Sequence, residues 1–302
     1  MKVRIGTRRS RLALAQAREV ADRLAELGAE PELVPMVTSG DRGVGATSSP
    51  AGLKGLFVAE IVRAVQEGRV DVAVHSAKDL PSEDPPGLTV AAVPERSDPF
   101  DVLVTRQEGA LPKGAVVGTS SLRRQAQLRR SRPELAVRDL RGNVDTRLAK
   151  LEAGEVDGLV LAAAGLARLG VSPPAAMPFP LDEMVPAPGQ GALAVQVRSE
   201  DKALLEFVTQ LDHSRSRRAF EAERSLVARL GGGCALPLGA YAEDRREGIR
   251  LLAVVIRPDG SDLVWAQAEA TSPQEVAGQV AETLLAGGAR EILAMVRGEG
   301  GG

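Results

Sequence analysis

Residues 118–147 read GTSSLRRQAQLRRSRPELAVRDLRGNVDTR, and the fold prediction starts from the strand-to-helix turn at the beginning of this stretch. An apolar strand at Ala115–Gly118 runs into Thr119, Ser120 and Ser121, and a helical segment follows. Free backbone N–H groups and the helix macrodipole favour an anion at such an N-terminus, especially beside hydroxyl groups. The sequence therefore predicts a βα unit whose helix begins at an anion site.

Arginines are concentrated around this turn. Four of them lie close to it along the chain: Arg123, Arg124, Arg141 and Arg147. Guanidinium groups bind carboxylates and phosphates through two parallel hydrogen bonds, so we predict a site for a multiply charged anion. Arg129, Arg130 and Arg132 follow on the same helix, and we interpret them as a solvated basic face.

Length and composition limit what the chain can be. Its 302 residues allow two or three domains, and 44% hydrophobic with 26% charged residues is typical of a soluble globular protein. A formal net charge of −2 and a pI near 5.9 argue against a dedicated nucleic-acid binder, which is usually basic throughout. The local arginines therefore suit a small, multiply anionic ligand better than a duplex.

The N-terminal sequence and the scarcity of Cys and His limit location and chemistry. MKVRIGTRRS enters a strand without an apolar signal region, and no later stretch is apolar for long enough to span a bilayer. One cysteine cannot form an internal disulfide, and two histidines leave no Cys/His metal cluster. We therefore expect a cytoplasmic protein that binds no metal and does not enter a membrane.

Alternating strand and helix patterns predict two α/β domains with doubly wound, mostly parallel sheets. The chain crosses between them at 94–101 and returns at 185–191. From Ser214, a helix and three strand-like runs predict a small C-terminal α+β domain with a three-stranded antiparallel sheet. A Gly/Ser/Pro-rich loop at 39–55 is long enough to be a lid. The predicted domains are residues 1–95 with 190–210, residues 96–189, and residues 211–302.

A faint internal repeat supports two similar halves. RIGTRRSRLALAQ and VVGTSSLRRQAQ share the order strand, Gly-Thr, Ser and helix, and VDVAVHSAKDL matches VDGLVLAAAGL in pattern. In the second pair, Lys78 and Asp79 fall opposite Ala164 and Gly165. Ligands bind at the carboxyl ends of the strands in such sheets. The repeat therefore predicts a cleft between two similar lobes, with its ionisable chemistry on the wall of the first.

Lys78 and Asp79 directly follow an apolar strand in VHSAKDL, where an α/β sheet places site residues. A buried carboxylate beside a lysine and near arginines would stay ionised, because opposite charges lower its pKa. Asp79 could then stabilise a cationic intermediate or bind a protonated amine. The alternative is that Asp79 only caps the following turn. We interpret His75 as a hydrogen-bonded residue at the strand end rather than a base.

Cys234 is the only cysteine and follows three glycines in LGGGCALPLG. A lone intracellular cysteine is usually buried and inert. The glycines would let the backbone approach a bulky group or expose the thiol, and nearby arginines would activate the thiolate. The residues themselves leave both interpretations open. A peptidase-like Cys–His pair would need His75 or His213, and neither has a recognisable partner motif.

Nine segments in order along nearly the whole chain carry a family resemblance. They are RIGTRRSRLALAQA, GDRG, LKGLFVAEI, VHSAKDLP, VGTSSLRRQAQL, DLRGNVDTRLAKL, LAAAGLARLG, PAPGQGALAVQVR and ERSLVARLGGGCALPLGAYA. In these segments the chain resembles the porphobilinogen deaminase (hydroxymethylbilane synthase) family of tetrapyrrole biosynthesis. The resemblance implies a transferase with three domains, the first two like periplasmic binding proteins and the third carrying a cysteine on a loop.

The resemblance also implies a reaction and a cofactor. Family members remove ammonia from four porphobilinogen molecules in turn and join them head to tail onto a dipyrromethane primer, and water then releases hydroxymethylbilane. The primer would be linked through a thioether to Cys234. Asp79 would be the catalytic carboxylate, stabilising the cationic azafulvene that remains when ammonia leaves. The two carboxylates on each pyrrole ring would account for the arginines.

The positions that match the family's contacts form two groups. The implied cofactor contacts besides Cys234 are Ser76, Lys78, Thr119, Ser121, Arg123, Arg124, Arg141, Gly142, Arg147, Gly165 and Arg168. The implied substrate contacts are Arg8, Ser10, Gln16, Lys54, Phe57, Ser120 and Gln190. Two positions depart from the family pattern, because Lys54 stands nearly alone in the lid and Arg11 lies where relatives often have proline. The family also suggests a monomer.

Two other functions are compatible with parts of the sequence. A two-lobed anion-binding protein without enzymatic activity would explain the cleft, although a cysteine-bearing third domain has no role in a simple binder. A nucleic-acid binder would use the arginine stretch, although aromatic residues for base stacking make up only 2% of the chain. We expect porphobilinogen as the partner, with no nucleic acid and no membrane.

Overall fold

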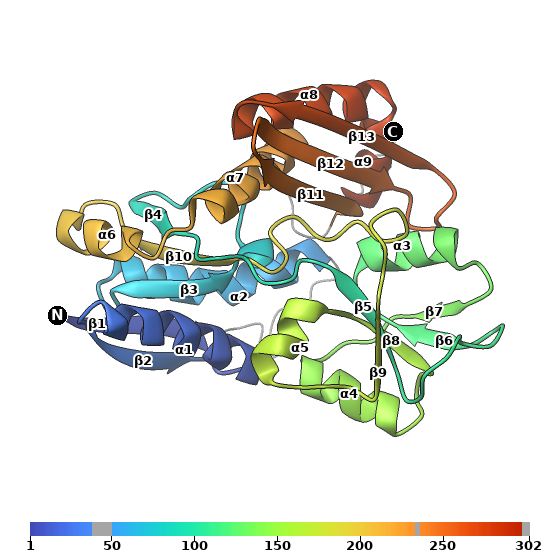
Figure 1. Ribbon diagram of the computed structural model, residues 1–302, viewed down its shortest axis with the longest axis horizontal. Helices are drawn as coiled ribbons and strands as arrows, with labels where there is room; N and C mark the ends of the chain where they lie inside the picture. The colour runs from blue at the N-terminus through green and yellow to red at the C-terminus, as the bar shows by residue number, and fades with distance from the viewer. Residues whose placement is uncertain (38–49, 233–235, 298–302) are drawn as a thin grey trace.

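The structure is a computed structural model that describes residues 1–37, 50–232 and 236–297, with the backbone alone at 50–57. The chain forms two lobes, each built on a five-stranded sheet, and a C-terminal unit built on a three-stranded sheet (Figure 1). The first lobe lies at the lower left of Figure 1, the second at the lower right, and the C-terminal unit above them. None of the helices in these ranges is long and apolar enough to cross a membrane.

The first lobe is a doubly wound sheet. Its elements are β1 (Lys2–Arg8), α1 (Arg11–Glu26), β2 (Glu30–Met36), α2 (Pro50–Gln66), β3 (Val72–Ser76), β4 (Leu88–Ala92), β10 (Leu193–Arg198) and α6 (Lys202–Thr209). The strand order is β2-β1-β3-β10-β4, and only β10 runs antiparallel to its neighbours. Side chains alternate across each strand, so Val195 joins the core under α1 and α6 while Ala194 joins the core under α2. Helices therefore cover both faces.

The second lobe repeats this arrangement. Its elements are β5 (Asp101–Thr105), β6 (Val116–Gly118), α3 (Leu122–Ser131), β7 (Ala136–Arg138), α4 (Val144–Glu152), β8 (Gly158–Ala162), α5 (Ala163–Leu169) and β9 (Ala175–Pro178). The strand order is β7-β6-β8-β5-β9, with β5 as the antiparallel strand. Leu159 packs in the core with α4 and α5, and Val160 packs in the core with α3. The two sheets match strand for strand, as the internal repeat predicts.

The C-terminal unit is the α+β element that the sequence predicts. Its elements are α7 (Ser214–Arg229), β11 (Leu238–Arg245), β12 (Gly248–Ile256), β13 (Leu263–Ala270), α8 (Pro273–Ala286) and α9 (Ala289–Arg297). The sheet is antiparallel in the order β11-β12-β13, and its core is shared with the three helices. The predicted fold class is confirmed, whereas the predicted domain limits stay predictions. Among the α-helices and strands that the structure describes, four escaped prediction, β9, α5, α6 and α9, each with nine residues or fewer.

The chain passes between the two lobes twice, at residues 94–101 and 185–191, and these two passages together form the crossing. β5 follows the first passage between lobes, β10 follows the second, and each becomes the antiparallel strand of its sheet. The second passage runs very close to the first lobe. Gly189 and Gly191 have φ of +74° and +86°, and a Cβ on Gly189 would lie 2.9 Å from the backbone of Ala77 and Lys78. This close approach places the end of β3 against the passage between the lobes.

Candidate functional site

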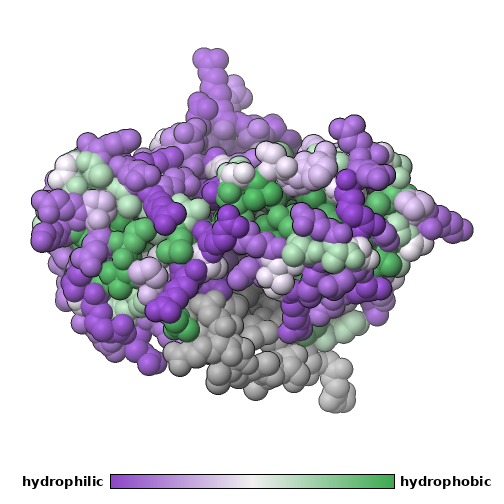
Figure 2. Space-filling view, turned by 90° about the horizontal axis from the view of Figure 1, so that it is seen from below, coloured by the Kyte–Doolittle hydropathy of each residue, from purple (hydrophilic) through white to green (hydrophobic). Residues whose placement is uncertain are grey.

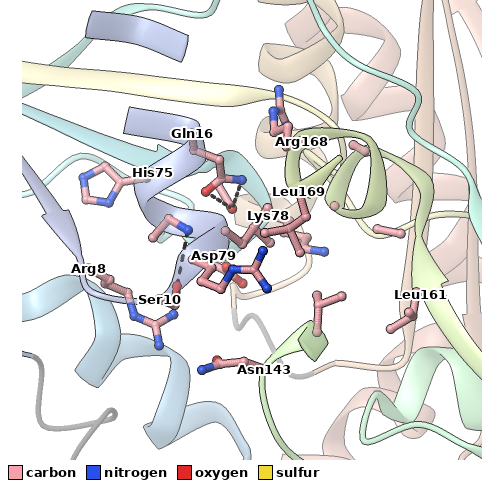
Figure 3. Close-up of a pocket in the computed structure, with 18 of the residues that line it drawn as sticks. Arg8, Ser10, Gln16, His75, Lys78, Asp79, Asn143, Leu161, Arg168 and Leu169 are labelled. Carbon is pink, nitrogen blue, oxygen red and sulfur yellow. Dashed lines mark hydrogen bonds between the residues drawn. The ribbon is translucent and has the colours of Figure 1, made fainter. Parts of the chain in front are cut away.

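A cleft of about 240 Å³ lies between the two lobes, where the carboxyl ends of β1 and β3 face those of the second sheet. The cationic and polar side chains that line it come from both lobes. They include Arg8, Ser10, Gln16, Ser76, Lys78 and Asp79 from the first lobe, and Arg124, Asn143, Arg147 and Arg168 from the second. Figure 3 shows the labelled side chains of the two lobes facing each other across the cleft. Viewed from below, hydrophilic and hydrophobic residues lie side by side on the surface of the molecule (Figure 2).

The first lobe supplies the predicted carboxylate. Asp79 ends a single 3-10 turn, Ala77–Asp79, that directly follows β3, so its side chain lines the cleft. Lys78 also lines it and donates from Nζ to Gln190 Oε1 at 3.4 Å. Ser76 and Gln16 are joined by hydrogen bonds of 2.8 and 3.1 Å between their side chains. The strand end therefore presents a carboxylate, an ammonium and a hydroxyl to the same space.

His75 is part of the wall behind this carboxylate. It is 5% exposed, and its Nε2 has no hydrogen-bond partner in the described part of the chain. Burial lowers the pKa of His75 to about 4, against smaller opposing effects of Gln196, Asp79 and Asp84. The imidazole is therefore neutral at pH 7 and adds no charge beside Asp79.

Arg147 brings a half-buried cation from α4. It donates from Nε to Gly142 O at 2.8 Å and from Nη2 to Ser120 Oγ at 3.3 Å. Burial, followed by the like charge of Arg124, lowers the pKa of Arg147 to about 10. The guanidinium is still protonated at neutral pH, and both causes make it a favourable partner for an added anion. Arg141, in contrast, is exposed and pairs with Asp139 at 3.2 Å.

Arg123 and Arg124 are committed to an internal partner. Arg124 Nη2 and Arg123 Nη2 lie 2.7 and 2.8 Å from the two carboxylate oxygens of Asp101, which is fully buried. Burial by itself would raise the pKa of Asp101, but the two arginines outweigh it and keep the pKa at about 2. Arg123 also donates to Val185 O at 2.6 Å, and Arg124 to Val160 O at 2.9 Å. These contacts give both arginines a structural role. Their role as cofactor contacts stays a prediction.

The remaining predicted residues divide between the cleft and its surroundings. Gly142 and Gly165 line the cleft, whereas Ser121 and Arg123 line a neighbouring cavity that Lys78 shares and that includes Leu236 beside the C-terminal unit. Ser121 caps α3 by accepting from Arg124 N at 3.5 Å. Besides Ser121 and Arg123, four predicted contacts are not among the described residues that line the cleft: Thr119, Ser120, Arg141 and Gln190. These four residues would contact a bound molecule only where that molecule extends beyond the cleft.

Some predictions need correction, and others concern residues that the structure does not describe. The solvated-face interpretation is wrong for Arg129 and Arg132, because Arg129 donates to Pro258 O and Arg132 pairs with Glu183 at 2.9 Å. Arg130 is exposed, yet it donates to Ser261 O at 3.1 Å. The last residues of the predicted lid, from Pro50 onward, belong to α2. Cys234, and the side chains of Lys54 and Phe57, lie outside the described residues.

Sequence reasoning missed the buried ions at the crossing. Glu223 of α7 is fully buried and pairs with Arg96 at 2.7 Å. Its other contacts are backbone N–H groups, Gly189 N from the crossing and Ala242 N from β11. A signal was available, since Glu223 is a charged residue within the apolar stripe of an amphipathic helix. Within residues 1–37, 50–232 and 236–297, no group of three His, Cys, Asp or Glu side chains could hold a metal ion.

Comparison with known proteins gives consistent matches along the chain. The family described as "Porphobilinogen deaminase, dipyromethane cofactor binding domain" matches residues 3–206, and "Porphobilinogen deaminase, C-terminal domain" matches residues 218–286. Proteins named porphobilinogen deaminase from Geobacillus kaustophilus (strain HTA426) and Brevibacillus brevis are 45% and 44% identical over 301 residues, with 98% of this chain and 97% of each relative covered. A methionine-bound nutrient binding protein from Burkholderia cenocepacia is 12% identical with a TM-score of 0.43, covering 72% of this chain and 93% of its own.

Proposed function

Because this chain belongs to the porphobilinogen deaminase family, we propose that it removes ammonia from four porphobilinogen molecules and joins them head to tail, then releases hydroxymethylbilane with water. The family's first domain binds a dipyrromethane cofactor, and the proposal includes its attachment to Cys234 through a thioether. The observation that carries the proposal is the placement of the Asp79 carboxylate in a cleft whose charged lining residues are mainly cations.

The cleft residues fit a polycarboxylate cofactor. Six lining side chains are cationic, Arg8, Arg11, Lys78, Arg124, Arg147 and Arg168, against two carboxylates, Asp79 and Asp145. A dipyrromethane built from two porphobilinogen units carries four carboxylates, which suit a lining in which cations outnumber carboxylates. Arg168 Nη2 is buried without a hydrogen-bond partner among the described residues, and such a donor favours an incoming acceptor. Lys78, Arg124 and Arg147 would hold the cofactor, with Ser76 as a neutral donor, and Arg168 would meet a carboxylate of the incoming substrate.

Asp79 performs the electrostatic part of the chemistry in this proposal. The protonated amine of the aminomethyl group of porphobilinogen leaves as ammonia, which takes the electron pair of the carbon–nitrogen bond, and a cation remains on the substrate. The Asp79 carboxylate stabilises that cation, and a closed cleft strengthens the attraction relative to water. The cofactor, when bound, would supply the pyrrole carbon that forms the new bond, and the hydrogen on that carbon would leave as a proton. The arginines position the carboxylates of the substrate, so that the reacting carbons stay in line as the chain grows.

Replacing Asp79 tests the proposal directly. We expect Asp79→Asn to fold normally and to lose at least about 100-fold in porphobilinogen turnover, since a fixed charge at a developing cation typically contributes that much. Asp145→Asn is the matched control, because Asp145 lines the same cleft but pairs with Arg11 at 2.6 Å. Near-normal turnover by Asp79→Asn, or an equal loss in both variants, would remove Asp79 from the mechanism.

Intact mass separates the enzyme from a simple anion-binding protein. The enzyme should be heavier than its sequence by two pyrrole units, and Cys234→Ser should lose this excess. A binding protein would have the mass of its sequence and would leave porphobilinogen unchanged.

A further inference from the structure

Glu19 connects the first lobe to an arginine of the cleft wall. It lies on α1 three residues after Gln16, so both side chains point from the same face of the helix. Arg168 of α5, in the second lobe, donates from Nε to Glu19 Oε2 at 2.8 Å. The Arg168 side chain is 7% exposed, and the Glu19 side chain is 28% exposed. This bond therefore crosses from one lobe to the other at a nearly buried position.

The orientation of Arg168 follows from this bond. Glu19 engages Nε, whereas Nη2 is buried without a hydrogen-bond partner among the described residues. A guanidinium carries five donors in a fixed plane, so anchoring Nε also fixes where the other donors point. Arg168 lines the cleft, and Figure 3 shows it on the same side of the pocket as Gln16. Nη2 is thus a donor without an acceptor among the described residues, and it lies in a side chain that borders the cleft.

Glu19 is itself kept in place. Its second oxygen, Oε1, lies 3.7 Å from Arg23 Nη2, one helical turn further along α1. The two helices also approach closely, because Gly165 of α5 faces Leu12 of α1, whose Cδ2 would lie 3.8 Å from a Cβ added at Gly165. The carboxylate therefore has one oxygen near each arginine and a packed helix pair behind it, which limits its rotation.

We propose that Glu19 is a positioning residue for substrate binding. It orients the Arg168 guanidinium across the lobes so that this group meets a carboxylate of the incoming substrate, and the identity of that substrate rests on the proposed function. Glu19 touches no reacting atom in this proposal. Its loss should therefore weaken substrate binding while the chemical step continues, because Arg168 remains present but is no longer oriented.

Steady-state kinetics on the full chain test the proposal. We expect Glu19→Ala to raise the KM for porphobilinogen about tenfold with kcat changed less than about twofold, the effect of one lost charge-assisted contact. Glu19→Gln retains an acceptor for Arg168 Nε and should recover part of the loss. Glu26→Ala is the control, since Glu26 is exposed near the end of the same helix and carries the same charge. An unchanged KM in Glu19→Ala would overturn the proposal, whatever happens to stability.

A double-mutant cycle adds a readout that does not depend on turnover. Urea midpoints of Glu19→Ala, Arg168→Gln and the double variant, measured without substrate, should be non-additive, and Glu19→Ala should not raise KM further in the Arg168→Gln background. Additive effects in both measurements would overturn the positioning role. A wild-type protein that does not consume porphobilinogen would instead overturn the proposed function and this inference with it. An active wild type with an unchanged Glu19→Ala would overturn the inference alone.

Discussion

Among the ion pairs that the described residues form between or beside the lobes, two sets differ sharply in their surroundings. The crossing cluster, Asp101 with Arg123, Arg124 and Gln190, is buried, and its carboxylate is 0% exposed. The mouth pair, Arg11 with Asp145, joins the N-terminal turns of α1 and α4 across the cleft, with side chains 68% and 37% exposed. The chemistry is the same in both places, guanidinium against carboxylate, and only the environment changes.

The difference separates a fixed region from an adjustable one. Gln190 donates to Asp101 Oδ1 at 2.9 Å and to Pro99 O at 2.7 Å, so the two passages of the chain are bonded to each other. Breaking a buried ion pair leaves an uncompensated charge, whereas breaking an exposed pair returns both groups to water. The crossing should therefore keep its geometry during turnover, and the mouth pair can separate at little cost when substrate enters.

The largest effect should come from breaking the crossing cluster. We expect Asp101→Asn to lower the free energy of unfolding by about 3–5 kcal/mol, because two buried arginines lose their counter-charge. The measurement is urea denaturation followed by circular dichroism. Asp139→Asn is the control in the same lobe, since its pair with Arg141 is exposed and should contribute at most about 1 kcal/mol. Equal losses in the two variants would contradict the comparison.

As pH falls, the contribution of His75 in the cleft wall to the free energy of unfolding should be lost before the contribution of Asp101 in the crossing cluster. The pKa of His75 is about 4 in the folded protein against 6.5 unfolded, so the unfolded state binds more protons as pH falls. Its contribution is present above pH 6.5 and is lost progressively toward pH 4, amounting to about 3 kcal/mol. The pKa of Asp101 is about 2 against 3.8, so its contribution is lost only below pH 3.8.

Variants of the two histidines test this order. The free energy of unfolding, measured from pH 7 to 4, should fall less steeply in His75→Gln than in the wild type. His213→Asn removes the other histidine that the structure describes while asparagine can replace its cap at the N-terminus of α7, where Ser216 N donates to the His213 ring. A slope that persists in His75→Gln would assign the acid sensitivity to another group.

Sequence patterns predicted the parts of this molecule that depend on local order. The alternation of strands and helices predicted both sheets, and the end of β3 predicted the placement of Lys78 and Asp79 in the cleft. The crossing cluster was not predictable in this way, because Asp101 meets Arg124 and Gln190 from 23 and 89 residues away. Those contacts depend on where the chain passes between the lobes.

The same limit explains the error at the end of α3. Arg129 and Arg132 lie in a run of charged residues that is typical of a solvated face. Their partners come from other elements, because Pro258 belongs to the turn between β12 and β13 and Glu183 precedes the second passage. A helix pattern predicts which residues share a face, but it does not predict which element packs against that face.

The smallest effect should come from the mouth pair, and its two members should differ. Asp145→Asn should lower the free energy of unfolding by up to about 1 kcal/mol, because it loses the ion pair and a favourable charge in the first turn of α4. Arg11→Gln loses the same pair but also removes a cation from the first turn of α1, where the helix dipole disfavours it, so its effect should be smaller. Both differences from wild type should shrink in about 0.5 M NaCl, since exposed charges are screened. A loss above about 2 kcal/mol in either variant, or no response to salt, would show that the mouth pair stabilises the fold as strongly as a buried pair. The mouth pair would then not separate easily when substrate enters.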